Sequence, residues 1–137
     1  MERSDARTAE VLERHLQSLN AGDLDAIIAD YAPDVVALTP GGFFSPDGIL
    51  RGRQAMRQAF ATLLSDFQKP GASFTLKQTS IEGDYAYIVW SAETPDNIYE
   101  AGSDTFVVRN GKIAAQTFAG KIVPRTAVTA AQPNETE

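Results

Sequence analysis

The feature that most constrains the fold is the change of hydrophobic period along the chain. Three segments have apolar residues at helical spacing: 6–19, 24–31 and 53–67. Four later segments have the composition of strands and are joined by short, turn-forming sequences: 73–82, 85–93, 98–109 and 112–123. Helices followed by a run of antiparallel strands predict an α+β fold, with the helices on one face of a sheet.

The connections set the limits of these elements. Pro33 is expected to end the second helix, and a short strand is predicted at 35–39. Residues 40–52 are expected to form a loop that carries the aromatic pair Phe43 and Phe44. We predict one domain at 1–123. The segment 124–137 is rich in Pro, Ala, Thr, Asn and Glu without periodicity, so we expect a disordered C-terminal tail there.

Composition excludes several classes of site and partner. The 137 residues include one His and no Cys, which rules out a multi-histidine metal site and a thiolate zinc site, and we expect no cofactor. A net charge of −6 argues against binding to nucleic acid or to an anionic membrane. The sequence has no apolar run of membrane-spanning length, and its charged N-terminus lacks a signal-peptide core. These features predict a cytoplasmic protein.

The strand predicted at 85–93 has two faces that both favour burial. Tyr85, Tyr87 and Val89 alternate with Ile88 and Trp90. A sheet with one solvated face would alternate apolar with polar residues instead. Because the helices cover one face only, we expect a homodimer through the outer sheet face, which we place on the side of Ile88 and Trp90. The alternative is that Trp90 covers a sheet edge or packs under a loop.

The register of the last two strands decides which side chains share a face. A two-residue turn at Asn110-Gly111 would place Asp104 opposite Thr117. A bulged turn would place Asp104 opposite Gln116 instead. The sequence leaves both registers open.

In the bulged register, a polar row crosses three strands within an apolar surround. A four-residue loop at 94–97 would place Tyr87 opposite Asp104, so that Gln116 completes the row. Three apolar side chains would surround the row: Val89, Phe106 and Phe118. A few polar groups within an apolar cup are typical of pockets for small ligands.

His15 and Asp104 are the candidate catalytic residues. His15 lies on the apolar side of the first helix, where a buried imidazole can act as a general base; the alternative is a hydrogen-bonded core histidine. Asp104 lies in an otherwise apolar strand, where burial would raise the pKa of its carboxyl; the alternative is an Asp bonded to a loop amide. If the two face each other, the Asp orients the imidazole. Tyr31 and Gln116 could hold a ligand oxygen. The acidic residues at 23, 25, 30 and 34 are expected to form a solvated face and helix caps.

Four segments resemble the nuclear transport factor 2-like superfamily, in its SnoaL-like and ketosteroid isomerase-like branch. They are LERHLQSLNAGDLDAIIADYAPDVVALTP, LRGRQAMRQAFATLL, IEGDYAYIVW and DTFVVRNGKI, and the resemblance extends over residues 8–122. It implies a cone, also called a cystatin-like fold, in which a curved antiparallel sheet wraps around three helices. It further implies an apolar pocket at the mouth of the cone and a homodimer through the outer sheet face.

The resemblance also implies roles for individual residues. Ketosteroid isomerases have an Asp general base before the proline that ends their first strand, and Thr39 stands there in this chain, so that activity is not expected. His15 takes the place of a tyrosine oxyanion donor, and Asp104 matches a protonated Asp donor. Tyr31 matches a tyrosine at the end of the second helix, and Phe60 replaces a tyrosine of the third.

Two classes of function follow from these observations. The first is a cofactor-independent isomerase, cyclase or dehydratase acting on a small, mostly apolar or amphipathic molecule that carries a carbonyl or hydroxyl group. His15 and Asp104 would transfer the proton, and a set of lining residues would bind the ligand: Tyr31, Thr39, Phe60, Tyr87, Val89, Phe106, Gln116 and Phe118. The second is a ligand-binding module or dimeric scaffold without turnover, which the Thr at position 39 favours.

Overall fold

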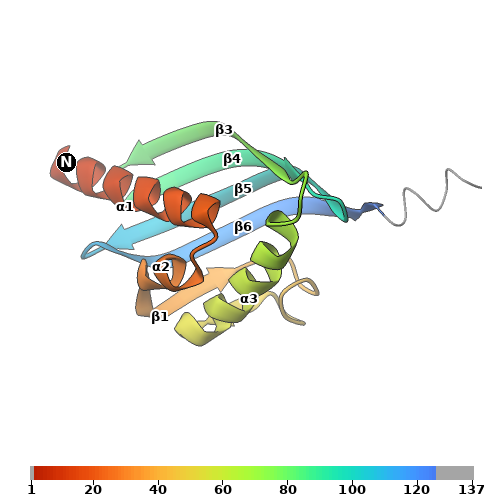
Figure 1. The fold of residues 1–137 in the computed structure, drawn as a ribbon. Coiled ribbons are helices and arrows are strands. Elements are labelled where there is room, and N and C mark those ends of the chain that lie inside the picture. The colour runs from red at the N-terminus through yellow and green to blue at the C-terminus, as the bar shows by residue number, and fades with distance from the viewer. Residues whose placement is uncertain (1, 126–137) are drawn as a thin grey trace, which may run out of the picture.

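The computed structural model describes residues 2–125 of the chain, so most of the predicted tail lies outside the described residues. The helices are α1 (Glu2–Ala21), α2 (Leu24–Ala29) and α3 (Gly52–Phe67). The strands are β1 (Tyr31–Leu38), β2 (Ile49–Arg51), β3 (Ser73–Glu82), β4 (Tyr85–Glu93), β5 (Asn97–Arg109) and β6 (Lys112–Pro124). Figure 1 shows the helices on one side of a curved sheet, which confirms the predicted α+β architecture.

The six strands form one sheet in the order β2-β1-β6-β5-β4-β3. The strands β3 to β6 form the predicted antiparallel meander, but β1 pairs with β6 in parallel, so the sheet is mixed. Figure 1 shows α1 crossing the β3 and β4 side of the sheet and α3 lying over β1. The helices therefore cover the concave face of the sheet.

The start of β1 differs from the prediction. The segment 24–31 was expected to be helical throughout, but α2 ends at Ala29 and Tyr31 begins a strand. The Asp23 carboxylate accepts from Ala26 N at 3.1 Å and caps the start of α2, whereas Pro33 favours extended backbone at its end. The predicted loop 40–52 also contains a short strand, Ile49–Arg51, which pairs with β1.

Two β-bulges set the register of β5 and were not predicted. The turn at Asn110-Gly111 has two residues, both with positive φ, and an extra residue at Ala114 then shifts β6. Ala101, also with positive φ, is an extra residue in β5. As a result, Asp104 lies opposite Phe118 on β6 rather than opposite Gln116 or Thr117.

The bulge at Ala101 also changes the pairing with β4. Glu93 pairs with Ile98 as predicted, but Asp104 lies opposite Ile88 rather than Tyr87. The predicted row of Tyr87, Asp104 and Gln116 is therefore wrong. Because neighbouring residues of a strand point to opposite faces, Tyr87 lies on the outer face, away from the helices.

A buried carboxylate attaches the C-terminal end of α3 to the turn between β4 and β5. Asp66 accepts from Thr94 Oγ1 at 2.8 Å, from Asn97 Nδ2 at 2.9 Å and from Tyr99 Oη at 2.7 Å. Burial opposes ionisation of Asp66, but these three hydrogen bonds and the nearby Lys69 hold its pKa below the ordinary value. The network therefore fixes the C-terminal end of α3 against the sheet.

Candidate functional site

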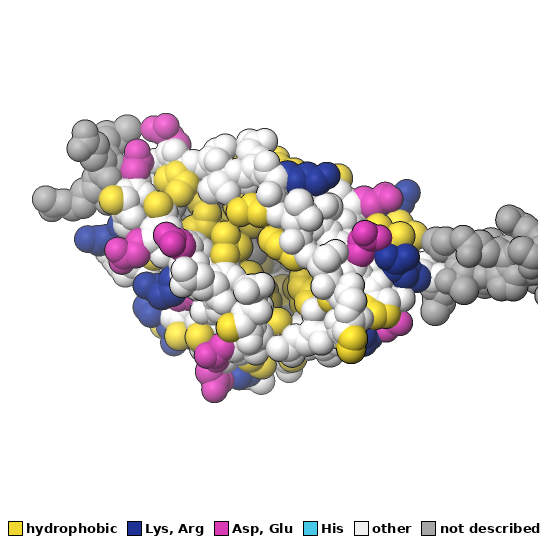
Figure 2. Space-filling model, turned by 45° about the horizontal axis from the view of Figure 1, so that its top comes forward, with side chains coloured by type: hydrophobic (Ala, Val, Ile, Leu, Met, Phe, Trp, Pro, Cys, Tyr) yellow, Lys and Arg dark blue, Asp and Glu magenta, His cyan; other side chains and the backbone are white. Residues whose placement is uncertain are grey.

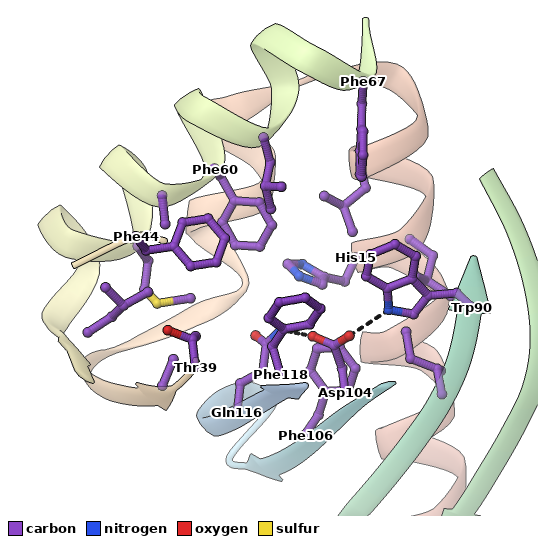
Figure 3. A pocket seen from close by; sticks show the side chains of 18 of the residues that line it. His15, Thr39, Phe44, Phe60, Phe67, Trp90, Asp104, Phe106, Gln116 and Phe118 are labelled. Atoms are coloured by element: carbon purple, nitrogen blue, oxygen red, sulfur yellow. Dashed lines mark hydrogen bonds between the residues drawn. The ribbon is translucent and has the colours of Figure 1, made fainter. Parts of the chain in front are cut away.

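An apolar pocket lies between the concave face of the sheet and the helices α1 and α3. Its cavity has a volume of about 90 Å³. Figure 2 shows hydrophobic side chains gathered within a hollow of one face. Aromatic rings dominate the lining, which includes Phe74. Figure 3 shows six of the rings arranged around the cavity: Phe44, Phe60, Phe67, Trp90, Phe106 and Phe118. The polar lining residues are few: His15, Thr39, Asp104 and Gln116.

Asp104 lies in the pocket wall with both carboxyl oxygens held by N–H donors. Trp90 Nε1 donates to Oδ1 at 2.7 Å, and Gln116 Nε2 donates to Oδ2 at 2.9 Å; both bonds are drawn in Figure 3. Burial among aromatic rings raises the pKa of Asp104, and the two hydrogen bonds and the nearby His15 offset this only in part. A carboxyl with a raised pKa in an apolar cavity can give a proton to a bound oxygen.

His15 is fully buried, and both of its ring nitrogens have partners. Nδ1 lies 3.0 Å from Asp30 Oδ2, and Nε2 lies 3.1 Å from Tyr31 Oη. The edges of the Phe60 and Phe106 rings pack around the imidazole. His15 borders the cavity but has no nitrogen free for a ligand.

Tyr31 and Gln116 connect His15 to Asp104. Tyr31 Oη donates to Gln116 Oε1 at 2.5 Å, and Gln116 donates to Asp104. Burial, together with the negative charges of Asp104 and Asp30, raises the pKa of Tyr31 well above its ordinary value, so its hydroxyl keeps its proton. The predicted convergence of His15 and Asp104 is therefore indirect, through two intervening side chains.

Asp30 anchors the other end of this network. Burial opposes its ionisation, but hydrogen bonds from His15 and from Arg14, at 2.8 Å from Nε, hold the pKa of Asp30 below its ordinary value. The side chain is almost fully buried, so the prediction of a solvated carboxylate at position 30 is wrong. Arg14 lies half-exposed on the outside of the network.

Comparison with protein families gives one match, to the SnoaL-like domain, over residues 12–116. The chain belongs to the SnoaL-like domain family. A search of curated proteins found no match. The match includes α1 from residue 12 onward, β6 as far as residue 116, and the network from His15 to Gln116.

Solved structures similar to this SnoaL-like domain share its fold. An NTF2-like protein of unknown function from Mesorhizobium loti is 27% identical, with a TM-score of 0.70 over 85% of this chain and 93% of that one. A putative ketosteroid isomerase from Kribbella flavida is 17% identical, with a TM-score of 0.67 over 85% and 79%. The epoxide hydrolase/cyclase-like enzyme SalBIII, described in pyran ring formation in the polyether salinomycin, is 17% identical, with a TM-score of 0.69 over 85% and 92%.

Most of the predicted ligand-binding residues border the pocket of this SnoaL-like domain. Five of them line it: Thr39, Phe60, Phe106, Gln116 and Phe118. Tyr31 lies behind the wall and acts through Gln116. Tyr87 and Val89 point to the outer face and do not line the pocket. Conversely, Ile88 and Trp90, which were assigned to the outer face, point inward and line it.

Thr39 has a structural partner instead of a free hydroxyl. Its Oγ1 donates to the carbonyl of Gly48 at 2.8 Å, and its backbone N–H donates to the same oxygen at 2.8 Å. These bonds close the base of the loop that carries Phe44 into the pocket. Thr39 therefore shapes the pocket but cannot accept a proton from carbon as a carboxylate would.

The sequence prediction missed two residues of the site, Asp30 and Phe44. Asp30 follows a helix end and gave no signal of burial. Phe44 was placed in a loop, although it packs edge-on against Phe118 at 6.4 Å between ring centroids.

Within the described residues, no cluster of three or more metal-ligating side chains occurs. None of the helices described in residues 2–125 is long and apolar enough to cross a membrane.

Proposed function

We propose that this SnoaL-like domain binds a small, mostly apolar molecule with a carbonyl or hydroxyl group and transfers a proton to that oxygen from Asp104. The reaction would be of the cofactor-independent isomerase, cyclase or dehydratase type. The observation that carries the proposal is the position of Asp104, a carboxyl of raised pKa held by two N–H donors in the wall of an aromatic pocket.

The donors around Asp104 favour this role because they fix the carboxyl without neutralising it. Trp90 and Gln116 supply neutral N–H groups, and neither can take the proton that Asp104 gives up. Because its pKa is raised, the Asp104 carboxyl keeps its proton to a higher pH than an ordinary aspartate does. Asp104 is therefore the proposed catalytic residue, and His15, which borders the cavity but has no free nitrogen, acts on it through Tyr31 and Gln116.

The volume of the cavity limits the ligand. A cavity of about 90 Å³ is smaller than the roughly 150 Å³ that holds a benzene molecule in an engineered protein. A single six-membered ring is therefore at the upper limit of size, and part of it would extend through the mouth or displace Phe44. A ketone of one ring is thus a suitable probe.

The proposal is tested with cyclohexanone in heavy water. A proton from Asp104 on the carbonyl oxygen promotes loss of an α proton to water, so bound ketone exchanges α hydrogen for deuterium, which NMR detects. We expect exchange above the buffer rate, lowered by about 10²-fold or more in Asp104→Asn. The control is Leu63→Ala, which enlarges the cavity without changing any polar group of its lining. Equal exchange rates in Asp104→Asn and the parent protein contradict the proposal.

A second candidate is binding without turnover. The hydroxyl of Thr39 is committed to Gly48, so the pocket has no carboxylate base at the position used by ketosteroid isomerases. In this case cyclohexanone would raise the melting temperature of the protein but would show no exchange above the buffer rate.

We also propose that the domain forms a homodimer through its outer sheet face. The exposed side chains that support this are uncharged and come from β1 and β4: Val36, Leu38, Tyr85 and Tyr87. Small uncharged residues of β5 and β6 lie between them, including Thr105 and Thr117, which pair with each other. The face is thus the side of Tyr85 and Tyr87, not that of Ile88 and Trp90.

A further inference from the structure

The hydrogen bonds from Asp30 to Asp104 have a defined direction. Gln116 presents Nε2 to Asp104, so its Oε1 faces Tyr31 and accepts the hydroxyl proton. Tyr31 Oη lies 3.1 Å from His15 Nε2, and Asp30 Oδ2 lies 3.0 Å from His15 Nδ1. Because the Tyr31 proton is directed at Gln116, this arrangement is complete when both ring nitrogens donate, as they do in an imidazolium.

The same side chains have a second complete arrangement, in which these donors are reversed. Half a turn of the Gln116 amide presents its N–H to Tyr31 and its carbonyl to a protonated Asp104. Tyr31 then donates to Nε2 of a neutral His15, which keeps one proton, on Nδ1, for Asp30. Both arrangements contain the same number of protons, because His15 has lost one proton and Asp104 has gained one. The state of the imidazole and the state of the pocket carboxyl are thus linked.

We propose that Asp30, which does not border the pocket, is a positioning residue that sets the protonation state of Asp104 through His15, Tyr31 and Gln116. A carboxylate at position 30 stabilises the imidazolium, and the imidazolium selects the arrangement in which Asp104 accepts two N–H bonds. The inference rests on the proposed function for the role of Asp104 as the acid, but the coupling itself requires no ligand.

The charged and titratable groups around Asp30 and Asp104 are consistent with an effect in which a carboxylate at position 30 favours the ionised form of Asp104. Asp30 faces Arg14 and His15, both on α1. Asp104 faces the indole of Trp90 on β4 and the amide of Gln116 on β6, and the charge of His15 on α1 favours its ionised form. Tyr31 on β1 lies between the two carboxyls and senses the charge of both. Removing the imidazolium should therefore leave Asp104 protonated to higher pH.

Trp90 provides a direct measurement, because it is the one tryptophan of the chain and donates to Asp104. Its fluorescence should change as Asp104 ionises, and Asp104→Asn should abolish that change. We expect Asp30→Asn to move the midpoint of the titration upward by about one pH unit. Asp25→Asn removes the same charge from the exposed surface of α2 and should leave the midpoint unchanged. A midpoint that is unchanged or lower in Asp30→Asn overturns the proposal.

A double-mutant cycle separates coupling through the chain from coupling through space. Tyr31→Phe removes the hydroxyl that holds the Gln116 carbonyl, so the amide can turn and accept from a protonated Asp104. We expect a higher midpoint in Tyr31→Phe and no further rise when Asp30→Asn is added. Additive shifts would show a through-space effect and overturn the proposal.

The remaining outcomes are also decisive. If Asp30→Asn does not fold, as judged by circular dichroism, Tyr31→Phe alone decides the question, and an unchanged midpoint overturns the coupling. All of these titrations are made without ligand. They can therefore succeed where cyclohexanone shows no exchange, which would contradict the proposed reaction but not the coupling.

Discussion

Trp90 donates its indole N–H to Asp104 at 2.7 Å, although its partner across the strand pair is Gly102 and not Asp104. The bond is diagonal and lies on the concave face, where a glycine opposite the indole leaves it room to turn toward the carboxyl. A methyl group at position 102 would lie 2.5 Å from the indole atom Cε2. The acid group of the pocket is thus held in place by a tryptophan that depends on a glycine.

Trp90→Phe should raise the pKa of Asp104 further. The substitution removes one of the two N–H donors that oppose the effect of burial, while an aromatic ring is retained. NMR of the Asp104 carboxyl carbon should show ionisation at higher pH than in the parent protein. Phe118→Leu removes a ring stacked on Trp90 at 5.9 Å but no donor, and should change the ionisation less. An equal effect of both substitutions would argue against the hydrogen bond as the cause.

Gly102→Ala should displace Trp90 and destabilise the domain. Three atoms of the indole ring lie within 2.8 Å of the position that the new methyl group would take. Overpacking of this kind costs about 1–3 kcal/mol in the free energy of unfolding, which urea denaturation measures. Ala119→Ser, on the outer face of β6, is the control and should change the free energy of unfolding little. Gly83→Ala is unsuitable as a control because φ is positive at Gly83. Unchanged stability and unchanged tryptophan fluorescence in Gly102→Ala would contradict the packing described.

Asp104→Asn should stabilise the domain relative to the parent protein as pH rises. Burial raises the folded-state pKa of Asp104 above the ordinary value of 3.8, so the folded protein holds this proton more tightly than the unfolded chain does. The contribution of Asp104 to stability is complete below pH 3.8 and is lost as pH rises through the raised pKa. Asn does not titrate and escapes this loss, which is about 1.4 kcal/mol for each pKa unit. Urea denaturation across this range measures the difference, and a constant difference would contradict the prediction.

Asp66→Asn should have the opposite dependence on pH. Its carboxylate accepts from Thr94, Asn97 and Tyr99, and its folded-state pKa lies below 3.8. The stabilisation is present above pH 3.8 and is lost as pH falls through the lowered pKa. We expect a loss of about 3 kcal/mol at neutral pH, since an amide oxygen cannot accept all three donors. Asp96→Asn, at the exposed end of the same turn, should cost far less.

The architecture was predictable from the sequence because periodicity and short turns are local signals. Helical spacing located α1 and α3, and strand-like composition with short turn sequences located four of the strands. The parallel pairing of β1 with β6 was not predictable in this way, because the two segments are separated along the chain by α3 and four strands. The resemblance to a known superfamily did not supply this pairing either, because the sheet it implied was antiparallel.

The site was harder to predict because its register depends on two single-residue bulges. The bulge at Ala101 carries no residue that demands positive φ, and the clearest signal was the neighbouring Gly102 within a strand. If this bulge is left out, the pairing of β4 with β5 slips by one residue and each β4 side chain is assigned to the wrong face. Tyr87 and Trp90 were misplaced in this way. Asp30 was missed for another reason, since its burial depends on packing against α1, which no local pattern reveals.

Tyr87→Lys should dissociate the proposed homodimer. Tyr87 is 39% exposed on the outer face, and a stable interface there would bury about 800 Å² on each partner. A lysine ammonium at that position would be costly to bury in the interface. Sedimentation equilibrium should give a dimer for the parent protein and a monomer for Tyr87→Lys, with unchanged circular dichroism. Gln17→Lys adds the same charge to the exposed surface of α1 and should remain dimeric. A parent protein that is monomeric at all concentrations would leave the outer face without this role, whereas a dimeric Tyr87→Lys would move the interface to another surface.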